Sequence, residues 1–319
     1  MISREELIKE ARSNDYKPEI LEKVYWLLTV LGQFMQVPYL RDRLVLKGGT
    51  ALNLFYFADI PRLSVDIDLN YIGKITREEM LEEKPIIMGA IHKILLQNRF
   101  ELYRNPQNYA GGKMVWRYPS VLGQKGNLEI DLNYMYRQPL WPVVWLKSKL
   151  IMKNSPNISV LDIHELAAGK LTALFARNAS RDIFDAHYLL NNVSLNTNQL
   201  RLGFVIYLAM SEVDLSKVTV DNIMHDTIDL RNSLLPVLRQ KNLPRSPSDV
   251  NIWARKLQEE LRQRISLIIP LRKDESEFIQ NIRLHGKIQP DLITEEKRLT
   301  EILLNHPGLQ WSVMKSERI

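Results

Sequence analysis

The sequence of 319 residues is 45% hydrophobic and 25% charged, enough for one large core or two ordinary ones, and two domains are favoured. It contains no cysteine, which excludes a disulfide framework, a thiolate metal site and a cysteine nucleophile. The net charge is +6, and residues 1–160 hold most of it, with 22 basic against 17 acidic side chains. This balance suits binding of a polyanion such as a nucleotide or RNA, although many solvated surfaces are equally basic.

The first residues give no sign of a targeting segment. Residues 1–6 lack the order of basic then apolar residues that a signal peptide has, and no apolar run approaches the length that crosses a bilayer. We therefore expect a soluble, cytoplasmic protein without a membrane partner.

The N-terminal region alternates helical and extended patterns. Residues 5–36 carry apolar side chains at helical spacing and predict one or two helices, and residues 43–47 predict a short strand. Gly48 and Gly49 interrupt this strand, and residues 51–56 resume with helix-forming side chains. The two glycines are thus expected at a turn from strand to helix.

A second strand, over residues 64–72, has two chemically different faces. The apolar face carries Val65, Ile67, Leu69 and Tyr71, and the opposite face carries Ser64, Asp66, Asp68 and Asn70. Because side chains two apart on a strand point to the same side, Asp66 and Asp68 are placed to share divalent cations. The pattern predicts a half-buried strand with an open acidic face.

Beyond this strand the pattern changes near residue 160. Residues 78–97 predict a helix, and residues 113–118 and 127–136 predict paired strands around a glycine-containing turn. The period then becomes helical and stays so, with polar, proline-bearing breaks near residues 191–198 and 240–249. We therefore divide the chain into an α/β domain, residues 1–160, and a mostly helical domain, residues 161–319.

The glycine turn and the acidic strand together are typical of a nucleotide site. Glycines let the backbone approach a phosphate, and the helix that follows offers free amides, while Thr50 offers a hydroxyl. Asp66 and Asp68 would hold the metal that phosphoryl or nucleotidyl transfer requires. Taken separately, such a turn is usually only a turn and such aspartates only a solvated face, but their succession favours a function.

A second group of charges follows in the helical region. Lys170 and Arg177 fall on one stripe of a predicted helix, and Asp182 and Asp185 are neighbours on the helix that begins near Arg181. These cations and carboxylates are expected to meet across a short turn. A salt-bridged helical hairpin explains the pattern as well as a functional site does.

Both patterns resemble those of one family. Residues 47–52 (KGGTAL), followed by Arg62, Ser64 and residues 66–69 (DIDL), resemble the signature of AbiEii-type nucleotidyltransferases, which lie within the DNA polymerase β-like superfamily. The pattern E-L-x2-G-K-x6-R-x3-R-D-x2-D over residues 165–185 is also similar to that family. The longer loop between the glycines and the aspartates, with threonine after the glycines, matches this subgroup better than a generic polymerase.

The resemblance implies a polymerase β-like nucleotidyltransferase domain with a mixed sheet, followed by a helical domain that completes the active-site cleft. Members of the family are toxins of abortive-infection and type IV toxin–antitoxin systems, and related mycobacterial toxins add nucleotides to tRNA 3′ ends. The implied partners are an NTP, a tRNA acceptor and an antitoxin encoded nearby. Two alternatives stay open: the same fold modifying a protein or a small molecule, and a binding module without turnover.

The resemblance also implies roles for particular residues. Asp66 and Asp68 would bind Mg²⁺, and Lys170 and Asp185 match positions required for activity. Asp131, on the strand that begins near residue 128, would be the third acidic residue and is favoured over the neighbouring Glu129. The residues expected to contact the nucleotide are Gly48, Gly49, Thr50, Arg62, Ser64, Arg177, Arg181 and Asp182.

Other residues suggest no site by themselves. The six histidines show no zinc-ligand spacing. Trp116, Trp141, Trp145 and Trp311 have side chains able to stack on bases, but an isolated tryptophan is more often part of a core or of a groove wall. Beyond residue 200 the sequence carries almost no functional signal.

Overall fold

The computed structural model describes residues 2–105, 111–150, 155–244 and 246–316. The chain forms two compact units, each made of several segments. The first unit consists of residues 1–137, 143–161 and 236–243. The second unit consists of residues 138–142, 162–235 and 244–319. Among the described residues, no helix is both long and apolar enough to span a membrane.

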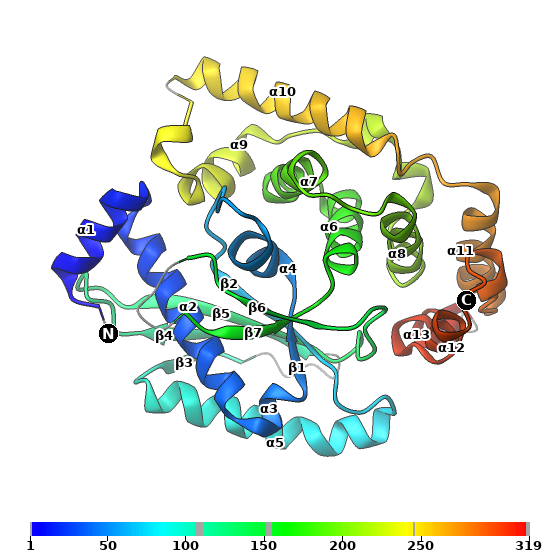
Figure 1. Cartoon of the computed structure of the whole chain (residues 1–319), viewed down its shortest axis with the longest axis horizontal. Coiled ribbons are helices and arrows are strands. Elements are labelled where there is room, and N and C mark those ends of the chain that lie inside the picture. Colours follow the sequence, from blue (N-terminus) through cyan, green and yellow to red (C-terminus); the bar gives the residue numbers. More distant parts are fainter. Residues whose placement is uncertain (1, 106–110, 151–154, 245, 317–319) are drawn as a thin grey trace. The chain divides into compact units, whose positions relative to one another are not determined.

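A mixed sheet forms the centre of the first unit (Figure 1). Within the described residues it has seven strands, in the order β3-β4-β5-β2-β1-β7-β6. Their bounds are Leu44–Leu46 (β1), Asp66–Tyr71 (β2), Glu101–Arg104 (β3), Gly111–Tyr118 (β4), Gly126–Asn133 (β5), Val144–Lys147 (β6) and Asn157–Val160 (β7). β2 pairs in parallel with β5 and β1 with β7, whereas the other neighbours are antiparallel. The predicted mixed sheet is confirmed.

Helices cover this sheet. They are α1 (Arg4–Asn14), α2 (Pro18–Gln36), α3 (Pro38–Arg41), α4 (Gly48–Ala51), which continues as the π-helical η1 (Leu52–Tyr56), and α5 (Arg77–Gln97). A capping box at Ser3 begins α1, and Pro18 stands at the first turn of α2, where its missing N–H costs nothing. The apolar side of α2, including the fully buried Leu27 and Leu31, packs on β2, β5 and β7. This burial is the main core of the unit.

The second unit is built from helices. The long ones are α6 (Ile163–Arg177), α7 (Ser180–Asn192), α8 (Thr197–Ala209), α10 (Pro247–Ile265), α11 (Lys273–His285), α12 (Lys297–Asn305) and α13 (Pro307–Ser316). Its short helical turns are η2 (Leu215–Lys217), η3 (Val220–Asn222), α9 (Thr227–Asp229), η4 (Leu230–Leu234) and η7 (Pro290–Leu292). The chain re-enters the first unit at residue 236, within η5 (Leu235–Val237), and η6 (Gln240–Asn242) belongs to that unit. α6 packs on α7 and α8, α10 on α7, and α11 on α8 and α13.

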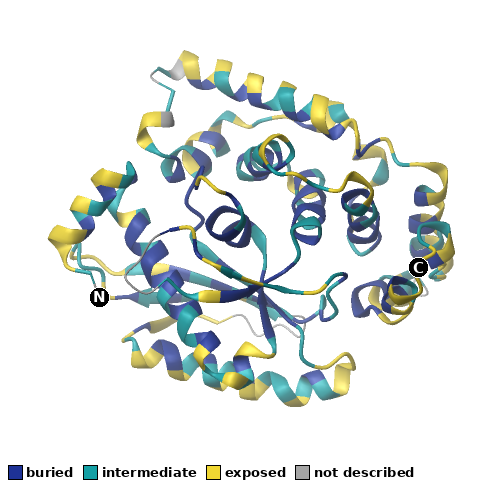
Figure 2. Ribbon diagram, in the orientation of Figure 1, coloured by how far each residue is buried: buried dark blue, intermediate teal, exposed yellow. Residues whose placement is uncertain are grey.

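Most elements lie where their periodicity predicts them. Figure 2 shows buried residues along β1 and β2 and exposed residues on the outer sides of α5 and α10, which is the amphipathic arrangement that the patterns indicate. The sequence pattern does not predict β3, β6 and β7, each of which is only four residues long. The helical period after residue 162 is interrupted at residues 193–196 and 240–244, near the two predicted breaks, and also over residues 211–239, which form mostly short turns.

Candidate functional site

The acidic face predicted for β2 is present, and β5 extends it. In the parallel register Asp66 lies opposite Glu129 and Asp68 opposite Asp131, so four carboxylates share one side of two neighbouring strands. Asp66 and Asp68 are half-buried, while Ile67 between them is fully buried on the other side. The open part of this face ends at Asp68, because Asn70 is buried, contrary to the expectation.

Two lysines, which no local sequence pattern predicts at this position, flank these carboxylates. Lys23 of α2 has its Nζ 3.8 Å from Oδ1 of Asp66, and Lys113 of β4 has its Nζ 2.7 Å from Oε2 of Glu129. Burial raises the pKa of Asp66, the carboxylates of Glu129 and Asp68 raise it further, and the two ammonium groups oppose this. The pKa of Lys113 is raised: its burial works against this, but the neighbouring carboxylates outweigh the burial. Lys113 therefore stays charged.

The glycine turn is fastened directly to the acidic strand. Gly48 has a φ of +71°, a conformation that glycine adopts without strain, and a Cβ at this position would clash with Oδ2 of Asp68. The backbone N–H of Lys47 donates to the carbonyl of Asp68 at 2.9 Å, and the hydroxyl of Thr50 donates to the carbonyl of Asp66 at 2.5 Å. Glycine is thus required where the turn meets the carboxylate.

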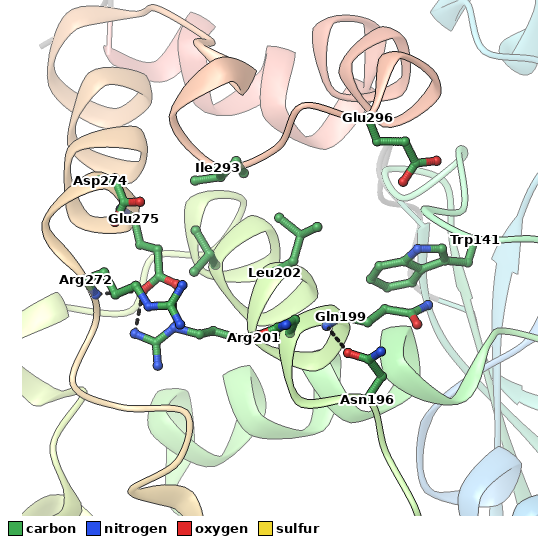
Figure 3. Close-up of a pocket in the computed structure, with 12 residues that line it drawn as sticks. Trp141, Asn196, Gln199, Arg201, Leu202, Arg272, Asp274, Glu275, Ile293 and Glu296 are labelled. Carbon is green, nitrogen blue, oxygen red and sulfur yellow. Dashed lines mark hydrogen bonds and ion pairs between the residues drawn. The ribbon is translucent and has the colours of Figure 1, made fainter.

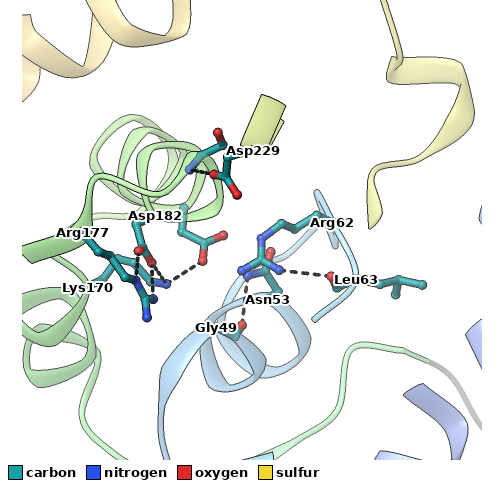
Figure 4. A network of polar contacts seen from close by, with 10 residues as sticks. Gly49, Asn53, Arg62, Leu63, Lys170, Arg177, Asp182 and Asp229 are labelled. Carbon is teal, nitrogen blue, oxygen red and sulfur yellow. Dashed lines mark hydrogen bonds and ion pairs between the residues drawn. The ribbon is translucent and has the colours of Figure 1, made fainter. Parts of the chain in front are cut away.

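The side chain of Thr50 corrects one expectation. It is fully buried, and its hydroxyl donates a hydrogen bond to the main-chain carbonyl of Asp66. The hydroxyl therefore holds the turn to the strand and does not face a phosphate. The turn continues into a helix in which Nδ2 of Asn53 donates to the carbonyl of Gly49 at 2.9 Å (Figure 4). Only the backbone of this turn is left as the part that would contact a phosphate.

Arg62 and Ser64, also expected at the nucleotide, precede the acidic strand and are both buried. Nη1 of Arg62 donates to the carbonyl of Leu63 at 3.1 Å (Figure 4), and the backbone of Arg62 forms a bridge with Leu238. The segment 236–243 thereby holds the approach to β2. The roles of Arg62 and Ser64 at a nucleotide stay predictions.

The donor set of the acidic face fits a hard divalent cation. Carboxylate oxygens are the ligands that Mg²⁺ prefers, and Asp66, Asp68 and Asp131 bring three of them to adjacent positions of two strands. Among the described residues, no group of three or more histidine, aspartate or glutamate side chains is already arranged around a metal position. The fit therefore rests on the chemistry and register of the carboxylates.

The charges predicted in the helical region meet as expected. Nζ of Lys170 lies 2.9 Å from Oδ1 of Asp182 and 2.9 Å from Oδ2 of Asp185. The guanidinium of Arg177 binds both oxygens of Asp182, at 2.6 and 3.0 Å (Figure 4). The side chains of Asp182 and Asp185 are 1% and 0% exposed, so this is a buried network and not a surface pair.

The ends of α6 and α7 hold this network in place. Asp162 caps α6 by accepting from the N–H of His164, and Asn178, with a left-handed φ of 51°, ends it. The first N–H of α7, at Ser180, donates to Oδ2 of Asp229 at 2.6 Å (Figure 4), a cap that lies 49 residues away and that no local pattern predicts. Burial would raise the pKa of Asp182, but Lys170 and Arg177 outweigh it and lower that pKa.

Of the nucleotide contacts expected in this region, Arg177 is exposed and Arg181 is half-buried, whereas Asp182 is buried. The side chain of Arg177 is 65% exposed although one edge of it binds Asp182. Burial would raise the pKa of Asp229, but hydrogen bonds from Ser233 and Ser180 outweigh it and lower that pKa, and the nearby charge of Arg181 acts in the same direction. Asp182 itself is enclosed by its two cations, and contact with a nucleotide stays a prediction for it.

Glu165, the first residue of the second pattern, has a structural position. It is buried, and its carboxyl group accepts from the backbone N–H of Leu140 at 2.9 Å and from the hydroxyl of Tyr207 at 3.0 Å. Burial raises the pKa of Glu165 to about 8, although these hydrogen bonds act in the opposite direction. It ties α6 to the segment 138–142 and to α8.

The comparisons with known proteins agree with this geometry. A family described as "Nucleotidyl transferase AbiEii toxin, Type IV TA system" matches residues 30–277. No curated protein matches the sequence significantly. Among solved structures, MenT4, a nucleotidyltransferase toxin from Mycobacterium tuberculosis H37Rv, is similar with a TM-score of 0.60 at 16% sequence identity, over 97% of this chain and 99% of that one. The fold is thus that of a nucleotidyltransferase toxin, and the chain belongs to the AbiEii family of nucleotidyltransferase toxins of type IV toxin–antitoxin systems.

Proposed function

We propose that this toxin transfers a nucleotide from an NTP to the 3′ end of a tRNA, with Mg²⁺ held by Asp66 and Asp68. The observation that carries the proposal is the register of β2 and β5, which brings Asp131 next to Asp68 on the same face. The family supplies the NTP-dependent reaction and implies an antitoxin partner. The metal and the acceptor are our inference.

The carboxylates of the acidic face would have different roles in the reaction. When bound, the divalent cation supplies positive charge for the triphosphate and for the attacking oxygen. Asp66 and Asp68 would hold this cation. Asp131 would accept the proton of the 3′-hydroxyl while the hydroxyl oxygen bonds to the α-phosphorus of the NTP and pyrophosphate leaves. Lys113, kept charged by its neighbours, would balance part of the negative charge of this face.

The glycine turn would hold the phosphates through its backbone. The first amides of a helix lack acceptors inside it, and the missing side chain of Gly48 lets the turn lie directly against the carboxylate of Asp68. Because the turn is bonded to the carbonyls of Asp66 and Asp68, the phosphate grip and the metal ligands would move as one rigid piece.

We assign Lys170 to the same reaction because its motif belongs to the matched region of the family. An ammonium group there would neutralise charge that develops on the leaving pyrophosphate. Asp185, 2.9 Å away, would orient it, and Asp182 and Arg177 would fix the pair from the other side.

A transfer assay tests the proposal. Purified protein is incubated with labelled NTP, Mg²⁺ and total RNA, and label is followed in the tRNA fraction. We expect Asp66→Asn and Asp68→Asn to lower transfer by about a hundredfold or more. Asp42→Asn, the same chemical change at an exposed residue paired with Arg41, should transfer at the wild-type rate.

Other outcomes would change the conclusion in defined ways. Label in protein bands or in small molecules, with the RNA blank, would replace tRNA by another acceptor while keeping the reaction. Wild-type transfer by Asp66→Asn and Asp68→Asn proteins would overturn the assigned metal ligands. Transfer that is unchanged by removal of divalent cations would overturn the proposed cofactor.

A further inference from the structure

The helical unit contains a pocket that the proposed reaction does not use. Its volume is about 600 Å³, within the range of pockets that hold a small molecule or one nucleoside. It is lined by the segment 138–142, by α8, by the start of α11 and by the chain between η7 and α12 (Figure 3). Every lining residue belongs to this one unit.

One wall of the pocket is the ring of Trp141. The ring packs closely on α8 at Gly203, where a Cβ would lie 3.1 Å from Cη2 of the indole. Its other neighbour is His164, whose ring meets the indole nearly edge-on at 6.3 Å between centroids. Leu202 and Ile293 add apolar surface (Figure 3). A fixed indole with apolar neighbours is a surface on which a planar ring stacks.

Two polar groups border the indole. Figure 3 shows the carboxylate of Glu296 and the side-chain amide of Gln199 on either side of Trp141. Within the described part of the chain, neither of these two side-chain groups makes a hydrogen bond or an ion pair. The pocket therefore offers a pair of acceptor oxygens and one amide to a ligand that stacks on the ring.

The charges of the pocket argue against a phosphate inside it. Arg201 is closed off: it binds Glu275 at 2.5 and 2.7 Å and donates to the carbonyls of Ile268 and Pro270 at 2.7 and 2.8 Å. The remaining charged side chains are two carboxylates, Asp274 and Glu296, against one guanidinium, Arg272. This balance favours an uncharged ligand that donates hydrogen bonds.

We propose that this pocket binds a guanine base. Guanine is planar, and its Watson–Crick edge carries two adjacent N–H donors, at N1 and N2, that match the two oxygens of a carboxylate such as Glu296. Adenine and cytosine present a ring acceptor beside their amino group, and uracil has a single donor between two acceptors, so none of them makes this pair. The amide of Gln199 would then donate to O6 or N7, and Trp141 would stack on the ring.

The source of the base is either a free guanine nucleotide or a guanosine in an RNA strand. Both place the base on Trp141 and leave any phosphate outside the pocket, where the exposed Arg272 is the cation available to it. The proposal does not depend on the acceptor or the metal of the transfer reaction, because none of its residues belongs to the acidic face.

Binding of guanosine to the full-length protein tests the pocket. Guanosine has no phosphate, so the proposed metal and phosphate contacts contribute nothing to its affinity in calorimetry. We expect guanosine to bind at least about tenfold more tightly than adenosine, and both Glu296→Gln and Trp141→Leu to lose at least about tenfold. Glu295→Gln, at the adjacent exposed residue that does not line the pocket, is the matched control and should bind as wild type.

Further measurements separate the sources and the failures. A short single-stranded RNA with one guanosine that binds more tightly than guanosine, and loses this with Glu296→Gln, assigns the pocket to RNA; equal affinities assign it to the free nucleotide. Equal binding of guanosine and adenosine, or equal loss in Glu295→Gln and Glu296→Gln, would overturn the proposal. Asp66→Asn protein should bind guanosine normally, so failure of the transfer reaction is distinguishable from failure here.

Discussion

Replacing Lys170 with methionine removes an ammonium group that lies 2.9 Å from each of two buried carboxylates while keeping most of the side chain's length. Removing one partner of a buried ion pair costs about 3–5 kcal/mol, because the remaining charge stays buried. Asp182 also binds Arg177, so part of its charge stays paired in the variant. We expect the free energy of unfolding to fall by about 3 kcal/mol.

Urea unfolding at pH 7 measures this, with two comparisons. Lys256→Met is the matched control, because Lys256 is 74% exposed and its ammonium group lies as far as 3.9 Å from the carboxylate of Glu260. This variant should lower the free energy of unfolding by less than about 0.5 kcal/mol. The double variant Lys170→Met, Asp185→Asn removes both charges, and it should recover at least about 1.5 kcal/mol relative to the sum of the single variants.

The pH dependence gives an independent reading of the same network. The pKa of Asp182 is lowered in the folded protein, so its contribution to stability is present above the unfolded pKa of about 3.9 and is lost as the pH falls through the folded value. Because Lys170 causes part of this lowering, the methionine variant should lose less stability on acidification than wild type. Equal stability of Lys170→Met and wild type, or full additivity in the double variant, would refute the buried network.

The other predictions concern the turn, a buried acid and the toxin itself. Gly48→Ala strains a positive φ, which should lower the free energy of unfolding by about 1–2 kcal/mol, and it displaces Asp68, so nucleotide transfer should fall in activity assays. Gly123 also has a positive φ but open space around it, so Gly123→Ala should lower stability without lowering transfer. With a pKa of about 8, Glu165 is protonated when folded and ionises more readily when unfolded, so wild-type stability should decline between about pH 4.5 and pH 8, and urea titrations of Glu165→Gln should lack this decline. Expression in a bacterial host should arrest growth and Asp66→Asn should relieve it, whereas harmless high-level expression of wild type would contradict the toxin function.

Local sequence determined the parts of the site that lie within one element or one turn. Alternation along residues 64–72 places Asp66 and Asp68 on one side of β2, because a strand repeats every two residues. Glycines before a helical pattern indicate the turn at Gly48. Helical spacing places Lys170 on one side of α6 and Asp182 on one side of α7, and these two sides face each other in the structure. The physical reason is that these positions depend only on the geometry of a single helix, strand or turn.

Tertiary structure alone decided what lies beside these residues. The β2–β5 register places Asp131 opposite Asp68, and Lys23 reaches Asp66 from α2, a helix that carries no sign of this contact in its own pattern. The hydroxyl of Thr50 donates to a backbone carbonyl, and the indole of Trp141 packs closely on Gly203. Such contacts join segments far apart in the sequence, so they follow from packing and register and not from any local periodicity.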